Sequence, residues 1–146
     1  MDGFALLVGH LVGDYIIQND WMASNKTNQP PGPCPVGGTR EEYNLWREGL
    51  VHWWLGHITC TIHAALYTLS ITLVSFWWMP LWGYIACFLL HWIIDRYRLA
   101  REWMRVIGQE AFATGPLSPW SIIVVDNVWH LVTLLLIAAI SGRLPT

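Results

Sequence analysis

The stretch WSIIVVDNVWHLVTLLLIAAI, residues 120–140, decides the fold class of this chain. It is apolar enough and long enough to cross a membrane as a helix, yet it contains Asp126 and His130. These residues are four apart, so their side chains project from one helix face, one turn above the other. Ionisable groups in hydrocarbon are unfavourable unless they are paired, hydrated or bound to a cation. The pair therefore predicts a functional site inside a membrane span.

Two further apolar segments carry the same spacing, as His10/Asp14 and His91/Asp95. With an apolar stretch between them, they define four predicted spans, at residues 4–21, 50–79, 81–105 and 120–140. The second is longer than a bilayer requires, so we expect it to tilt or to project as a helix into water. The short connection at Pro80 makes the second and third spans an antiparallel hairpin. We therefore expect one all-α domain over residues 1–146, a four-helix transmembrane bundle.

The composition agrees with a membrane protein. Of the 146 residues, 54% are hydrophobic and only 12% charged, and eleven are Trp, which favours the lipid bilayer as the partner of this chain. The net charge of −2 gives no indication of a nucleic-acid partner. The three cysteines are odd in number and lack CxxC spacing, so no disulfide framework is expected.

The distribution of basic residues predicts how the chain is oriented in the membrane. Seven of the eight flank two loops, at residues 22–49 and 106–119, and only Arg143 falls on the opposite side; the seven are Lys26, Arg40, Arg47, Arg96, Arg98, Arg101 and Arg105. By the positive-inside rule, both loops are expected in the cytoplasm and both termini outside.

This orientation places the three pairs at matching depths. In each of the three spans the Asp lies nearer the cytoplasm and the His one turn deeper, which gives a carboxylate layer beneath an imidazole layer. His63 of the second span is placed to join the imidazole layer, and Gln18 lies one turn beyond Asp14.

Three His and three Asp in one bundle form a ligand set for a divalent metal ion: zinc, manganese or iron, with enough donors for two ions. The predicted ligands are His10, Asp14, His91, Asp95, Asp126 and His130. Gln18, His63 and Asn127 are predicted to contact the ligands or the substrate, and Lys26, Arg98 and Arg101 to hold an anionic substrate. The same residues also suit hydrogen-bonded pairs that hold the bundle together, or a hydrated proton or ion path.

Gly9 and Gly13 form a close-packing face on the first span. That face contacts either a neighbouring helix of the chain or a second copy in a homo-oligomer.

The segments HLVGDYIIQNDWMA (10–23) with NKT (25–27), HWIIDRYRLAR (91–101) and IIVVDNVWH (122–130) resemble a family of small bacteriophage and bacterial membrane proteins, the domain-of-unknown-function 3307 family. The resemblance covers three of the four spans in the same order. It implies a polytopic protein of the bacterial inner membrane, encoded by a phage genome, but no established reaction. The polar pattern is also similar in kind to that of membrane proteins labelled metal-dependent hydrolases.

The sequence thus predicts a metal-dependent hydrolase of a lipid-like or amphiphilic substrate, with the metal near the cytoplasmic side. Two non-catalytic alternatives stay open. One is a protein that binds or relays a cation or proton, and the other is a phage-encoded structural or envelope-modifying protein.

Overall fold

The computed structural model describes residues 3–75 and 79–142, and every regular element within these ranges is a helix. The all-α class predicted from the sequence is therefore confirmed. The elements are α1 (Gly3–Leu11), the π-helix η1 (Val12–Ile17), α2 (Asp20–Asn25), α3 (Arg40–Ser75), α4 (Leu81–Arg96), α5 (Leu99–Val106), α6 (Glu110–Thr114) and α7 (Trp120–Ile140).

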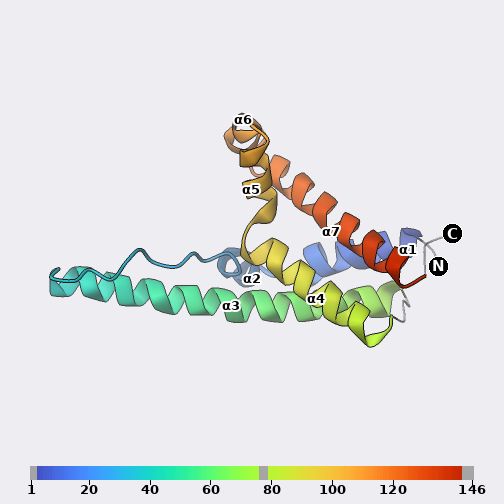
Figure 1. The fold of residues 1–146 in the computed structure, drawn as a ribbon, viewed down its shortest axis with the longest axis horizontal. Coiled ribbons are helices and arrows are strands. Elements are labelled where there is room, and N and C mark those ends of the chain that lie inside the picture. Colours follow the sequence, from blue (N-terminus) through green and yellow to red (C-terminus); the bar gives the residue numbers. More distant parts are fainter. Residues whose placement is uncertain (1–2, 76–78, 143–146) are drawn as a thin grey trace.

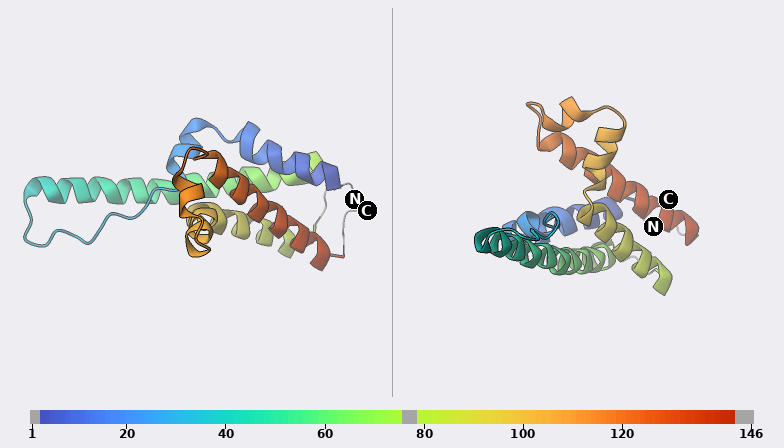
Figure 2. Two further views of the ribbon diagram at one scale, coloured as in Figure 1. Left: turned by 90° about the horizontal axis from the view of Figure 1, so that it is seen from above. Right: turned by 60° about the vertical axis from the view of Figure 1, so that its left-hand side comes forward.

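The long helix α3 supports the rest of the molecule. Its C-terminal half packs against α1, η1 and α4, and α7 in turn packs on α4 and α5. The start of α1, the end of α3, the start of α4 and the end of α7 all lie at one end of the molecule (Figures 1 and 2). The four apolar segments therefore alternate in direction along the chain.

Within the described residues, two helices are long and apolar enough to cross a membrane. They are Arg40–Val74, with a mean hydropathy of 1.3, and α7, with a mean hydropathy of 2.1. The helices of the other two predicted spans are shorter: they are the apolar helix Phe4–Ile17 and α4. Residues 76–78 of the predicted second span, and Arg143 on the predicted outer side, lie outside the described residues.

Capping and a left-handed residue divide the first and third predicted spans. The helix predicted over 4–21 is interrupted at Gln18 and Asn19, because the Asn19 side chain accepts a hydrogen bond from the Met22 backbone N–H and starts α2. The helix predicted over 81–105 is interrupted at Arg98, whose φ of 51° is left-handed. There α5 turns away from α4 and packs on α7 (Figure 1).

The predicted loop 22–49 is partly helical, because α3 begins at Arg40. A capping box explains this start: the Glu42 N–H donates to Thr39 Oγ1, and the Thr39 N–H donates to Glu42 Oε2 at 2.7 Å. The N-terminal part of α3 projects from the bundle as a long arm, with the preceding loop running beside it (Figure 1). The Trp46 indole N–H donates to the Gly32 carbonyl and fastens the two together.

Gly9 and Gly13 face α3 of the same chain. A Cβ atom on Gly13 would lie 2.6 Å from Ser70 Oγ and 2.7 Å from Tyr67 Cδ2. The close-packing face predicted from the sequence therefore brings η1 directly against α3. Because η1 carries Asp14, this contact places a carboxylate beside the middle of α3.

Candidate metal centre

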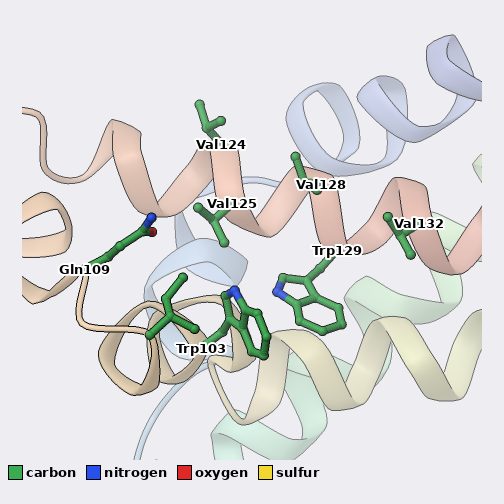
Figure 3. A pocket seen from close by; sticks show the side chains of 8 residues that line it. Trp103, Gln109, Val124, Val125, Val128, Trp129 and Val132 are labelled. Carbon is green, nitrogen blue, oxygen red and sulfur yellow. The ribbon is translucent and has the colours of Figure 1, made fainter.

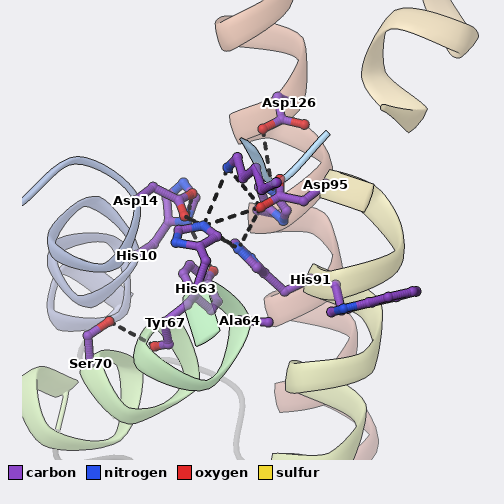
Figure 4. A network of polar contacts seen from close by, with 12 residues as sticks. His10, Asp14, His63, Ala64, Tyr67, Ser70, His91, Asp95 and Asp126 are labelled. Carbon is purple, nitrogen blue, oxygen red and sulfur yellow. Dashed lines mark hydrogen bonds and ion pairs between the residues drawn. The ribbon is translucent and has the colours of Figure 1, made fainter. Parts of the chain in front are cut away.

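A cluster of buried polar side chains lies where α1, η1, α3, α4 and α7 meet (Figure 4). Four of its members are imidazoles that are at most 2% exposed: His10, His63, His91 and His130. Three carboxylates accompany them, from Asp14, Asp95 and Asp126. The structure thus brings together all six ligands predicted from the sequence, and adds His63.

The Asp95 carboxylate is at the centre of the cluster. Its Oδ2 lies 3.2 Å from Nε2 of His63, 3.2 Å from Nε2 of His91 and 2.8 Å from the Lys26 Nζ. The two imidazole Nε2 atoms are only 3.0 Å apart. Three nitrogen atoms, from the loop after α2, from α3 and from α4, therefore converge on one carboxylate oxygen.

The other oxygen of Asp95 faces α7. Asp95 Oδ1 lies 3.3 Å from His130 Nε2, which lies 3.4 Å from Asp126 Oδ2. The Asp126 side chain is 30% exposed, whereas those of Asp95 and His130 are at most 2% exposed. Asp95 therefore connects the buried imidazoles of His63 and His91 to the more exposed carboxylate of Asp126.

Asp14 approaches the cluster from η1. Its Oδ1 lies 3.4 Å from His63 Nε2 and 3.6 Å from His91 Nε2, and it makes no hydrogen bond within the described residues. The part of the chain that the structure describes contains three groups of His and Asp whose ligand atoms all lie within 4.8 Å of one another: Asp14/His91/His130, His63/His91/Asp95 and Asp95/Asp126/His130. His and Asp donors at these separations can hold a divalent ion.

His10 occupies a different place from the other imidazoles. Its Nε2 lies 2.8 Å from Asn127 Oδ1, and its Nδ1 lies 3.0 Å from the Tyr67 hydroxyl. The Asn127 amide nitrogen donates to the Ile123 carbonyl, which orients Oδ1 toward His10. His10 Nε2 thus donates to Asn127, and both ring nitrogens are engaged. His10 Nδ1 also lies 3.4 Å from Asp14 Oδ2, so the predicted His10/Asp14 pair forms, although His10 belongs to none of the three donor groups. His63 presents its Nε2 to Asp14 and Asp95.

Aromatic stacking holds the imidazoles in place. The Tyr67 ring stacks on His91 with centroids 3.7 Å apart, and His91 stacks on His130 at 4.1 Å. The Nδ1 atoms of His63, His91 and His130 have no hydrogen-bond partner among the described residues, so these rings make their polar contacts through Nε2. Tyr67 was not predicted from the sequence, although it lies one helical turn beyond His63 and therefore on the same face of α3.

Lys26 has an unexpected partner. The sequence predicts that it holds an anionic substrate, but its ammonium pairs with Asp95 inside the cluster. Burial alone would lower the pKa of Lys26, yet the Asp95 carboxylate outweighs this effect, with help from Asp14 and Asp126, and the pKa lies above its ordinary value. Lys26 is the only lysine of the sequence and stands in the loop after α2. That loop is held by Arg98, whose guanidinium donates to Thr27 Oγ1 at 2.7 Å.

A cavity of about 570 Å³ opens onto the carboxylates. Its walls combine three kinds of residue: acidic (Asp14, Asp95, Asp126), basic (Lys26, Arg98, Arg101) and apolar (Ala100, Pro119, Ile122, Ile123). Gln18 and Asn127 also line it, and Gln18 Oε1 is buried with no hydrogen-bond partner among the described residues. The residues predicted to contact substrate, apart from the deeper His63, therefore face one cavity.

Two other cavities lack the acidic cluster. One, of about 380 Å³, lies between α5 and α7 and is lined by valines and by Trp103 and Trp129, which meet edge to face (Figure 3). The other, of about 300 Å³, lies beside α5 and shares Arg98 and Arg101 with the large cavity. Neither is lined by Asp14, Asp95 or Asp126, so the large cavity is the candidate site.

No protein-family model matches this chain, and no curated protein or solved structure proved similar to it. Its function must therefore follow from the chemistry of its own residues.

Proposed function

We propose that this chain is an integral membrane protein that uses a divalent metal ion to hydrolyse a lipid-like or amphiphilic substrate. One observation carries the proposal: the three carboxylates of the His/Asp cluster line a cavity whose other walls include basic and apolar side chains. A substrate with an anionic group and a hydrocarbon portion matches both kinds of wall.

The distribution of side chains supports a lipid environment. Polar residues such as His63, His91 and Asp95 are buried, whereas large apolar side chains cover the outside. In the most apolar window of α7, only 22% of the residues are buried. Contiguous exposed apolar surface is unfavourable in water but not in hydrocarbon. Along α7 the exposed apolar residues include Val124, Val128, Val132, Leu135, Leu136 and Ile140.

We extend this proposal to the topology and the family. The segments containing α1 with η1 and α4 would complete a four-helix transmembrane bundle with α3 and α7. Both termini would face outward, and residues 22–49 and 106–119 would face the cytoplasm of a bacterium, as the basic residues predict. The resemblance of the three His/Asp segments supports membership of the phage and bacterial family.

The contact distances support a metal ion in the cluster. His130 Nε2 lies 3.3 Å from Asp95 Oδ1 and 3.4 Å from Asp126 Oδ2. Two ligands of a tetrahedral ion, each about 2.1 Å from it, lie roughly 3.4 Å apart. A bound ion would also offset the unfavourable burial of three carboxylates.

Each wall of the cavity has a role in this proposal. The ion would lower the pKa of a bound water and polarise the substrate's carbonyl or phosphoryl oxygen. The Arg98 and Arg101 guanidinium groups would bind the anionic group of the substrate. Ile122 and Ile123 would contact its hydrocarbon portion, and the Gln18 and Asn127 amides are placed to orient it.

A proton or cation relay fits the structure less well. Beyond the imidazoles, toward the end where α1 begins, the interior is filled by a buried apolar group: Leu6, Ile71, Cys87, Leu134, Ile137 and Ala138, with Tyr67 and Met79. These residues provide no chain of ionisable groups beyond the cluster, whereas a relay across a membrane needs one.

The experiment combines elemental analysis with hydrolysis. Protein purified in detergent should contain zinc, manganese or iron and should cleave members of a panel of amphiphilic carboxylic and phosphoric esters. A chelator should remove both the ion and the activity. Asp126→Asn keeps the side-chain shape but removes an anionic donor, so it should abolish hydrolysis.

The exposed Asp20 supplies the matched control, because Asp20→Asn makes the same chemical change outside the cluster and should leave activity intact. Wild-type protein without a bound ion, or hydrolysis that survives the chelator, would disprove the proposed function.

A further inference from the structure

Lys26 already places a positive charge in one of the three donor groups. Its Nζ lies 2.8 Å from Asp95 Oδ2 and 3.4 Å from His63 Nε2. Those two atoms belong to the His63/His91/Asp95 group. The ammonium therefore lies where an ion held by this group would contact the same oxygen and the same imidazole.

Of the three members of the Asp95/Asp126/His130 group, Lys26 contacts only Asp95. The Asp95 oxygen of this group is Oδ1, whereas Lys26 contacts Oδ2, so one carboxylate can serve both positive charges at once. Asp126 is the most exposed of the three carboxylates, so this group also opens to the cavity. An ion that acts on a substrate needs such an open position.

The charges of the cluster favour a single divalent ion. Asp14, Asp95 and Asp126 supply three negative charges, and one ammonium with one divalent ion balances them. Two divalent ions beside Lys26 would leave an excess of two positive charges in a buried site. Even one bridging anion would leave a net positive charge there, which is unfavourable away from water.

We propose that Lys26 is the built-in second cation of the centre, so that the centre binds one divalent ion, at Asp95/Asp126/His130, rather than two. The inference rests on the proposed function, because it assumes that the cluster binds metal. It goes further by fixing the number of ions and their position. It also gives Lys26 a place in the metal centre instead of contact with the substrate.

Manganese provides the probe. Metal-free protein in detergent is titrated with Mn²⁺, the bound ions are counted, and electron paramagnetic resonance tests whether they are magnetically coupled. Wild type should bind one Mn²⁺ per chain with an uncoupled signal. Lys26→Met keeps the aliphatic length but removes the charge, so it should bind two ions, which couple because both contact Asp95. Lys26→Arg retains a positive charge and should still bind one.

A second pair of variants tests the position of the bound ion without changing Lys26. Asp126→Asn should lose the ion, whereas His63→Gln should retain it, because His63 belongs to the group that Lys26 fills. Two ions in wild type would overturn the inference while leaving the proposed function standing, as would one ion in folded Lys26→Met. Loss of the ion in folded His63→Gln would overturn the assigned position. Wild type that binds no Mn²⁺ or other divalent ion would overturn the proposed function itself, and the inference with it.

Discussion

The Lys26 ammonium and the Asp95 carboxylate form an ion pair of 2.8 Å between a loop and the last turn of α4. Their side chains are 15% and 2% exposed, so the pair is largely shielded from water. Breaking such a pair leaves an uncompensated charge and is strongly destabilising. The loop that follows α2 is thereby fastened to the centre of the bundle.

This pairing predicts that Lys26 reacts slowly with amine-specific reagents. Because Lys26 is the only lysine, peptide mapping after acylation reports its side chain alone. We expect Asp95→Asn to accelerate acylation of Lys26 about tenfold or more, since hydrogen bonds to charged groups contribute about 1.5–3 kcal/mol. Asp20→Asn should have no effect. Equal rates in wild type and folded Asp95→Asn would show that the pair does not protect the amine.

Close packing of η1 against α3 predicts a large effect from one methyl group. Gly13→Ala places a Cβ atom within 2.7 Å of the Ser70 and Tyr67 side chains, so it should reduce the free energy of unfolding by about 1–3 kcal/mol. Gly32→Ala is the control, because a Cβ atom there meets nothing within 4 Å. Thermal unfolding in detergent measures both. Equal stability of the two variants would contradict the observed helix contact.

The left-handed backbone at Arg98 predicts an unusual order of stability. Arg98→Ala and Arg98→Gly both lose the hydrogen bonds to Thr27, but only glycine adopts this conformation without strain. We expect the glycine variant to be the more stable by about 1 kcal/mol, the reverse of their order within a helix. Thermal unfolding of both proteins measures the difference. A more stable alanine variant would mean that α4 continues as a helix past Arg98.

The proposed orientation predicts the labelling of a native cysteine. Cys34 is exposed in the loop before α3, whereas Cys60 and Cys87 are buried. A membrane-impermeant maleimide should therefore spare the protein in sealed cells and label it in inverted vesicles. Cys34→Ser should abolish the labelling. Labelling of Cys34 in sealed cells would reverse the proposed topology.

The convergence of His and Asp side chains could be predicted because it follows from helix geometry. Residues four apart share a face, and alternating helix directions place the three pairs at similar depths. His91/Asp95 and Asp126/His130 meet as this geometry requires. The same reasoning placed His63 in the imidazole layer.

The break in the helix at Arg98 and the partners of Lys26 and His10 depend on long-range contacts, which the periodicity of a sequence does not reveal. Arg98 leaves the helical conformation where its side chain binds Thr27, a residue 71 positions away in the sequence. Lys26 reaches Asp95 across a similar separation, through a loop whose path is set by α2 and α3. His10 lies 3.4 Å from Asp14 on its own helix face, but its nearer partners, Tyr67 and Asn127, come from other helices. Local spacing could not reveal these long-range partners.

If the proposed topology holds, the position of His63 along α3 sets the depth of the His/Asp cluster in the membrane. At about 1.5 Å per residue, His63 lies roughly 18 Å from the end of α3 at Ser75 and about 35 Å from its tip at Arg40. With a hydrocarbon core about 30 Å thick and Ser75 near its outer boundary, the carboxylates would lie on the order of 10 Å below the cytoplasmic headgroups. Water for hydrolysis would have no route from the side, through the acyl chains. Hydration of the centre would have to come from the cytoplasm through the cavity bordered by Lys26 and Arg98, so the same passage would admit both water and the charged end of the substrate.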